Sequence, residues 1–210
     1  MNLLYRALAS GLLAAMLPIA ACTGSSLKWT EDVLLPDGRT VTLTRYQEFK
    51  GPSEPFTPPT ESYYWFEFKN PDTGKKVRWE NDRYLATVAL SFDGATPQLL
   101  TSPNFSGAFK FNCPDPSYLL FRHIDGRWVQ VPLTEIVPSV ITPNMTSFDV
   151  RYVRQFIEAN HGHLSAANVA AHGLSLFQGK VIDLTELKEQ TFGKECDDPD
   201  YMLRRPGEKQ

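Results

Sequence analysis

Four short turn segments divide most of this chain into pairs of strand-like runs. The segments are Pro36-Asp37-Gly38, Asn70-Pro71-Asp72-Thr73-Gly74, Asp93-Gly94 and Asp125-Gly126. An Asp or Asn close to a Gly, between runs of alternating apolar residues, is a strong short-range signal for a β-hairpin. The flanking runs are 29–35 with 39–49, 62–69 with 75–80, 84–92 with 97–101, and 118–123 with 127–131. The sequence therefore predicts a series of antiparallel hairpins.

The alternation is clearest in the second pair of runs. In the first run, Tyr64, Phe66 and Phe68 form an apolar face. Tyr63 and Trp65 lie on the opposite, mixed face. A period of two is the pattern of a strand. Four prolines interrupt the segment 50–60, so we expect a loop there. The run 137–141 adds one more possible strand.

The pattern changes to helical spacing after residue 145. The segment 146–160 places Tyr152 and Phe156 on one apolar stripe, as in an amphipathic helix. A second, Ala-rich helix is expected over 165–172, and one or two helical turns over 185–190. The segment 102–116 is expected to be a long ordered loop.

Strands followed by helices indicate an α+β fold with mainly antiparallel β structure. About eight strands would form a sandwich or a partly open barrel, with one or two helices near 147–172. The sequence leaves these two topologies open.

The first 22 residues have the pattern of an export signal. Arg6 precedes an uncharged run from Ala7 to Ala21, which is shorter than the roughly 20 apolar residues of a spanning helix. The run fits the apolar region of a secretory signal. It ends in Ile19-Ala20-Ala21-Cys22, which resembles the bacterial lipoprotein signal and implies that Cys22 becomes an acylated N-terminus. The alternatives are an ordinary secretory signal or a single anchor helix.

The residue after Cys22 bears on the membrane involved. It is Thr23, not the Asp that often retains such lipoproteins at the inner membrane. The resemblance therefore implies the outer membrane, with the domain facing the periplasm. We expect a signal peptide over 1–21, a linker over 22–27, a single β-rich domain over 28–192 and a polar tail over 193–210.

Two cysteines remain once Cys22 carries lipid, namely Cys113 and Cys196. An even pair in an oxidising compartment is expected to form one disulfide. Free thiols or a bond to a partner chain are the alternatives. No Cys-x-x-Cys spacing points to a redox or metal role.

Charge and motifs exclude several function classes. The formal net charge is -3, whereas nucleic-acid binders are normally basic, so no nucleic-acid partner is expected. The sequence contains no Gly-x-Ser-x-Gly elbow, phosphate loop or dinucleotide fingerprint. It therefore identifies no catalytic residue and implies no cofactor.

Four possible metal ligands follow one another near the predicted helices: Glu158, His161, His163 and His172. A zinc site needs three or four convergent ligands, and this spacing matches no established motif. Polar loop residues after a helix are the simpler interpretation. We therefore assign no metal and retain the four residues as candidates.

Aromatic residues are the remaining candidates for binding: Tyr63, Trp65, Phe105, Phe109 and Phe111. An exposed patch of this kind suits a glycan strand, a peptide or another protein. The interpretation that we favour is a two-layer core, in which such strands are buried on both faces, and the five residues are retained as candidates.

Three stretches carry a resemblance to other proteins. Residues 29–39, 64–68 and 112–116 are similar to a group of proteobacterial lipoproteins with no assigned activity. The likeness runs through most of the chain after Cys22. It implies an address and a fold class, but no functional residue.

The sequence thus favours a lipid-anchored periplasmic envelope protein that acts by binding and not by catalysis. Its expected partners are the membrane, through the lipid on Cys22, and an envelope protein or a glycan. One alternative is a periplasmic hydrolase of cell-wall or glycan material, with Glu158, His161 and His163 in its site. The other is an envelope immunity or exclusion protein that neutralises a toxin.

Overall fold

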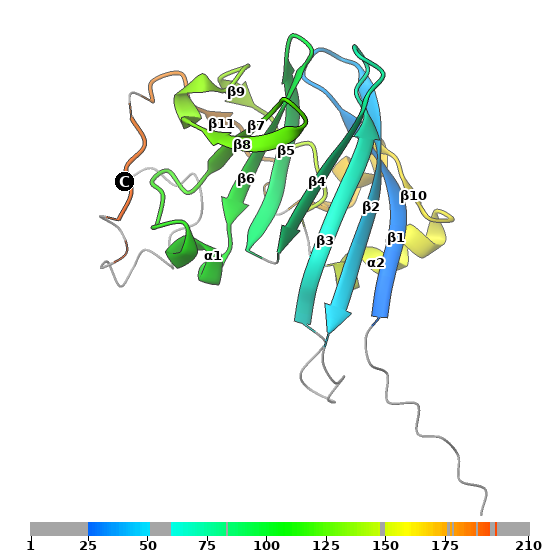
Figure 1. Ribbon diagram of the computed structural model, residues 1–210. Coiled ribbons are helices and arrows are strands. Elements are labelled where there is room, and N and C mark those ends of the chain that lie inside the picture. The colour runs from blue at the N-terminus through cyan, green and yellow to red at the C-terminus, as the bar shows by residue number, and fades with distance from the viewer. Residues whose placement is uncertain are drawn as a thin grey trace, which may run out of the picture.

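The fold is built mainly from antiparallel strands (Figure 1). The computed structural model describes residues 25–50, 60–82, 84–147, 150–175, 177, 179–187, 189–193 and 196. Within these residues, eleven strands form a five-stranded, a four-stranded and a two-stranded sheet. The predicted α+β, mainly antiparallel class is confirmed. The two larger sheets pack in a sandwich-like arrangement, and the strands that the structure describes form no closed barrel.

The five-stranded sheet is formed mainly by the first part of the chain, in the order β10-β1-β2-β3-β4. Its strands are β1 (Ser25–Leu34), β2 (Thr40–Lys50), β3 (Thr60–Lys69), β4 (Lys76–Asp82) and β10 (His163–Leu164). The two predicted hairpins join β1 to β2 and β3 to β4. Gly38 in the first turn has a φ of 85°, a left-handed conformation that glycine adopts without steric cost.

Each strand of this sheet buries alternate residues. Along β2, buried residues alternate with exposed or half-buried ones over the whole strand. Leu43 of β2 and Phe66 of β3 are fully buried on the inner face of the sheet. The outer face carries the intervening side chains, which are exposed or half-buried.

The four-stranded sheet packs against part of the inner face. Its strands, in spatial order, are β5 (Leu85–Asp93), β6 (Thr96–Pro103), β7 (Leu119–Ile124) and β8 (Arg127–Val131). Leu90 and Leu99 join Phe66 in the main core between the sheets. At the edge of the sandwich, the Trp128 indole donates to the Arg78 carbonyl over 2.8 Å. This bond fixes β8 beside β4.

Two helices cover the inner face near the start of β1 and the end of β2 (Figure 1). They are α2 (Val150–Ala159) and α3 (Ala166–Ala171). Val153 and Ile157 of α2 and Val169 of α3 pack with Trp29 and Phe49 of the sheet. Both helices fall within the predicted region, and Ser165 caps α3 by accepting from the Asn168 amide.

The strand β10 was not predicted. It pairs in parallel with β1, placing His163 beside Thr30. The Thr30 amide donates to the Gly162 carbonyl over 2.9 Å. This pairing joins distant parts of the chain, so no local sequence pattern indicates it.

A short helix, α1 (Phe105–Lys110), lies where a long loop was predicted over 102–116. The Asn104 side chain caps it by accepting from the Gly107 amide over 2.9 Å. Gly107 packs so closely that a Cβ there would overlap the carbonyl oxygen of Tyr84. The loop prediction was wrong because a polar cap and a close-packed glycine, and not an apolar stripe, define this helix.

Three further boundaries differ from the expectations. Residues 25–27 belong to β1, not to a linker. The predicted strand over 137–141 is the short β9 (Val140–Ile141), paired with β11 (Ile182–Asp183). The described part of 185–190 forms a turn at Thr185–Glu186 and no helix. A single 3-10 turn, η1 (Leu133–Glu135), links β8 to β9.

Candidate functional site

The outer face of the five-stranded sheet carries an aromatic ladder, which we define as Lys28, Tyr46, Trp65 and Arg78. Strand register pairs Lys28 with Tyr46 and Tyr46 with Trp65. The Tyr46 and Trp65 rings stack with centroids 5.6 Å apart and planes within 14° of parallel. The ladder therefore spans four strands from one side chain to the next.

Both cations of the ladder lie over the Trp65 ring. The Arg78 guanidinium carbon is 4.2 Å from the ring centroid, and the Lys28 amine is 5.8 Å away. Cation–π contacts of this kind are worth roughly 0.5–1 kcal/mol at exposed sites. The Trp65 ring thus contacts Tyr46, Arg78 and Lys28, and these contacts restrict its side-chain conformation.

Charged groups fix Arg78 in this position. Its guanidinium forms ion pairs with Glu80 and Glu67 and donates to the Tyr63 hydroxyl over 3.5 Å. Desolvation alone would lower the pKa of Arg78, but the hydrogen bonds to Tyr63 and Glu80 raise it. Arg78 therefore remains a cation under all physiological conditions.

The predicted aromatic candidates separate into two places. Tyr63 and Trp65 are half-buried on the outer face, so the two-layer core was the wrong interpretation for them. Phe109 lies on α1 and is 51% exposed, whereas Phe111 packs against the main core. The Phe105 side chain lies outside the described residues. The four aromatics whose side chains are described therefore form no single patch.

The predicted metal candidates do not converge. His163 faces Thr30 and Asp32 on the outer face, whereas His172 stacks on Phe156 with ring centroids 4.7 Å apart. His161 lies in the turn after α2 with a φ of 53°. Among the residues described, no three His, Cys, Asp or Glu side chains are placed to hold a metal ion.

One hydroxyl, imidazole and carboxylate do meet, on β1 and β10. Thr30 Oγ1 lies 2.9 Å from His163 Nδ1, and His163 Nε2 lies 3.1 Å from Asp32 Oδ2. A hydrolytic triad has the same sequence of groups, from hydroxyl to imidazole to carboxylate. It also needs hydrogen-bond donors that stabilise the oxyanion of the transition state. The Thr30 amide is already bonded to Gly162, and the His163 side chain is 46% exposed. We therefore interpret the contacts among Thr30, His163 and Asp32 as structural contacts that support the pairing of β10 with β1.

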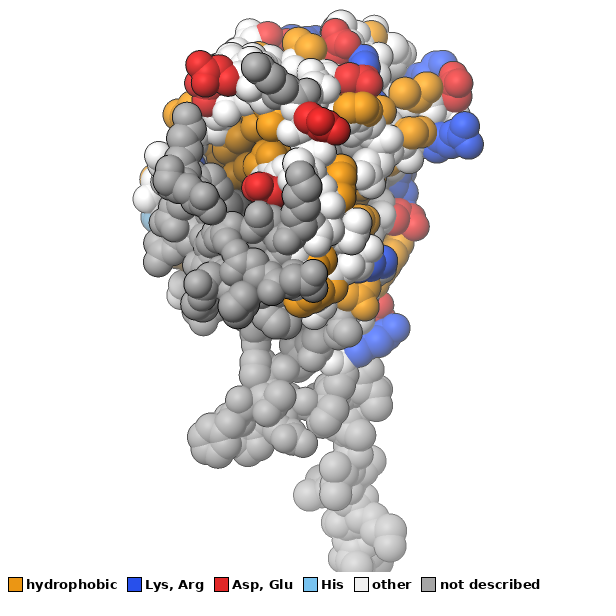
Figure 2. All heavy atoms as spheres, turned by 90° about the vertical axis from the view of Figure 1, so that its left-hand side faces the viewer, with side chains coloured by type: hydrophobic (Ala, Val, Ile, Leu, Met, Phe, Trp, Pro, Cys, Tyr) orange, Lys and Arg blue, Asp and Glu red, His pale blue; other side chains and the backbone are white. Residues whose placement is uncertain are grey.

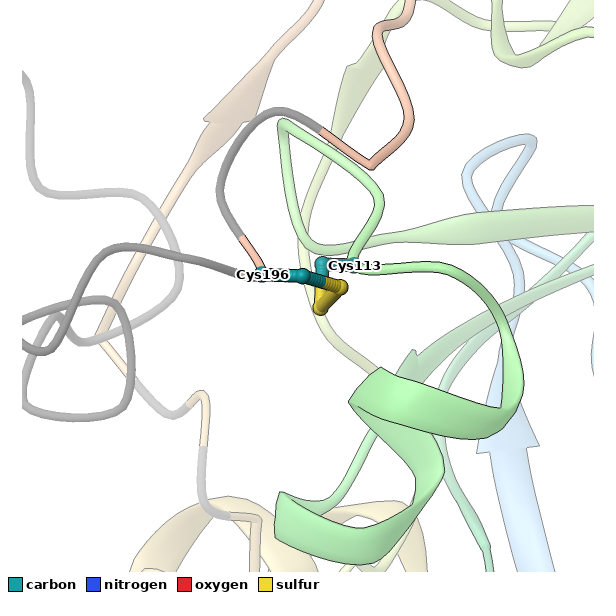
Figure 3. The surroundings of a disulfide bond; sticks show 2 residues. All are labelled: Cys113 and Cys196. Carbon is teal, nitrogen blue, oxygen red and sulfur yellow. A yellow bond between two sulfur atoms is a disulfide. The ribbon is translucent and has the colours of Figure 1, made fainter.

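Cys113 and Cys196 form a disulfide, as predicted from the sequence (Figure 3). The Cα atoms are 5.4 Å apart, and the residues are 83 positions apart in sequence. Nearby, the Gly193 amide donates to the Asn112 carbonyl over 2.7 Å, and Asp115 pairs with Thr191. The bond thus ties the end of the described chain to the segment after α1.

A hollow of about 410 Å³ lies beside the end of β8. Its lining contains apolar side chains, an acidic group and amides, from Gln130, Val131, Pro132, Leu133, Thr134, Glu189, Gln190 and Phe192. Figure 2 shows hydrophobic side chains gathered on this side of the molecule, with acidic side chains around them. A hollow of this volume is in the range of small-ligand sites, and the described residues that line it include no His, Cys or Ser.

Sequence inspection missed three of the four members of the ladder. Tyr46 and Arg78 occupy the outer faces of strands predicted from the sequence, whereas Lys28 lies one residue before the predicted run 29–35. Only the register between strands brings them to Trp65. A Lys, Tyr or Arg on the exposed face of a predicted strand is too common a pattern to have identified them.

Comparison with known proteins adds no family. No protein-family model matches the chain, and no curated protein or solved structure is significantly similar to it. The lipoprotein resemblance therefore stays a prediction.

Cys22 and the signal over 1–21 lie outside the described residues. Among the helices that the structure describes, none is long and apolar enough to cross a membrane.

Proposed function

We propose that this chain is a lipid-anchored envelope protein that binds another envelope protein through the aromatic ladder. The observation that carries the proposal is the ordered stack of Tyr46, Trp65 and Arg78 on the outer face. Trp, Tyr and Arg are the residue types that contribute most binding energy at protein interfaces. Side chains that are already ordered lose less conformational entropy when a partner binds.

The geometry favours a protein over a glycan as the partner. A sugar ring binds an aromatic side chain by covering an open face of the ring. The Trp65 ring is instead already in contact with the Tyr46 ring and the Arg78 guanidinium. The ladder presents aromatic rings, a guanidinium and an amine, beside the carboxylates of Glu67 and Glu80, and these groups complement a polar and aromatic protein surface.

The test is a crosslinking pull-down of the lipidated protein from its own envelope, read by mass spectrometry. Wild type is compared with Trp65→Ala and with Phe192→Ala, which removes a 43% exposed aromatic from the hollow. The proposal expects one dominant protein that Trp65→Ala loses and Phe192→Ala keeps. If Phe192→Ala lost the captured protein and Trp65→Ala kept it, the binding site would be the hollow and not the ladder.

The same experiment addresses the alternative functions. A captured toxin would identify an immunity protein, which is a special case of binding. Recovery of glycan without a protein partner would contradict the proposal. Hydrolysis of cell-wall material that Thr30→Ala abolishes would instead support a hydrolase at Thr30 and His163.

A further inference from the structure

The distance between the proposed lipid site and the folded domain is very short. β1 begins at Ser25, three residues after Cys22. A fully extended chain spans at most about 3.6 Å per residue, so the Cα atoms of residues 22 and 25 lie no more than about 11 Å apart. The start of β1 therefore stays close to the surface that holds the lipid. This step rests on the lipidation in the proposed function.

Strand register identifies what else lies at that end of the sheet. Ser25 pairs with Phe49, and Lys50 pairs with Thr60. The start of β1, the end of β2 and the start of β3 therefore form one end of the five-stranded sheet, the lower end in Figure 1. Lys50 is exposed there, with its amine 3.8 Å from Glu48.

The turns between the strands gather at the opposite end. The Arg39 guanidinium, after the first turn, lies 2.7 Å from the Asp72 carboxylate in the turn between β3 and β4. The side-chain amide of Asn70 donates over 2.8 Å to the Ala95 carbonyl in the turn between β5 and β6. The ten residues of β1 separate the two ends by about 30 Å.

From this geometry we infer that the sheet end bearing Ser25, Phe49 and Lys50 rests against a phospholipid bilayer. The turn end then points away from the membrane. Lys50 lies at the height of the lipid phosphates, where a cation is favoured by an anionic surface. Lys28 lies three residues along β1 from Ser25, so the aromatic ladder lies near the bilayer. The outer face that carries the ladder is then roughly perpendicular to the membrane surface.

Fluorescence quenching tests this orientation with two matched variants of the lipidated chain. Lys50→Cys and Lys75→Cys each replace an exposed lysine, at the bilayer end and at the turn end respectively. Each is labelled with an environment-sensitive fluorophore and placed in vesicles of phosphatidylethanolamine with a minority of phosphatidylglycerol. The quencher is a doxyl group on the lipid tails near the headgroup. The fluorophore at residue 50 is expected to be quenched by the doxyl lipid. The fluorophore at residue 75 is expected to be quenched no more than the same label is in solution.

Two controls separate this inference from the proposed function. Intact mass spectrometry reports whether Cys22 carries acyl chains, and an unacylated mature chain would contradict the proposed anchor. With acylation present, equal quenching at both positions, or more at residue 75, would overturn the orientation. A long Gly-Ser insertion between Gly24 and Ser25 should reduce quenching at residue 50. Unchanged quenching would show that the short tether is not what holds this end at the membrane.

Discussion

Glu31 and Arg45 form an ion pair inside the protein. Arg45 Nη1 lies 2.7 Å from Glu31 Oε2, and the two side chains are 8% and 0% exposed. Both groups also bind the backbone of Thr146, whose amide donates to Glu31 and whose carbonyl accepts from Arg45. The pair therefore joins the five-stranded sheet to the segment that leads into α2.

Breaking this pair on one side should be strongly destabilising. Glu31→Gln leaves the buried Arg45 guanidinium without a compensating charge, which typically costs about 3–5 kcal/mol. Urea unfolding of the soluble domain measures the change. The double variant Glu31→Leu/Arg45→Met removes both charges and should lose less stability than the sum of the losses in Glu31→Leu and Arg45→Met. Additive losses would show that the pair has no coupling.

The disulfide should contribute much of the stability of the C-terminal segment. Replacing both cysteines, as Cys113→Ser/Cys196→Ser, is expected to cost up to about 4–5 kcal/mol, because the unfolded chain is freed from a long closed loop. Thermal unfolding with and without reductant checks this. Reductant should lower the midpoint of the wild type and leave that of the double variant unchanged.

Gly107 should not tolerate a side chain. Gly107→Ala places a methyl group against the Tyr84 carbonyl, so we expect α1 to shift and the protein to lose about 1–3 kcal/mol, as in other overpacked sites. Ser106→Ala is the matched control, since Ser106 is exposed on the same helix. It should be neutral or slightly stabilising in the same urea experiment. Equal effects of the two variants would contradict the close packing.

Tyr118 should make stability fall at alkaline pH. Burial raises the pKa of Tyr118 from 10.0 to about 12. Above pH 10 the unfolded chain therefore loses this proton while the folded protein keeps it, and stability decreases between pH 10 and pH 12. Tyr118→Phe should remove this part of the decrease. An identical pH dependence in the variant and the wild type, measured by urea unfolding, would exclude the effect.

The sequence predicts those parts of the fold that short-range chemistry determines. The Asp-Gly turns at 37–38, 93–94 and 125–126 join strands as expected, and the alternation around Phe66 identifies the buried face. The same alternation puts Glu31 and Arg45 among inward-facing positions, a pattern that indicates a buried ion pair.

The missed features depend on contacts between distant residues. The pairing of β10 with β1 crosses 133 positions, and no local pattern encodes it. The candidate site needed the register of several strands before Tyr46, Trp65 and Arg78 became neighbours. The α1 helix depended on Asn104 as a cap and on the space available at Gly107.

The placement of β1 between two partners also determines how the domain resists force. β1 pairs along its whole length with β2 on one side, and at Thr30 and Glu31 with β10 on the other. Tension applied at Ser25 along the axis of β1 would load these hydrogen bonds together in shear, whereas tension across the strand would open them one at a time. A pull along β1 through the first residue of the domain would therefore be shared by the whole β1–β2 ladder.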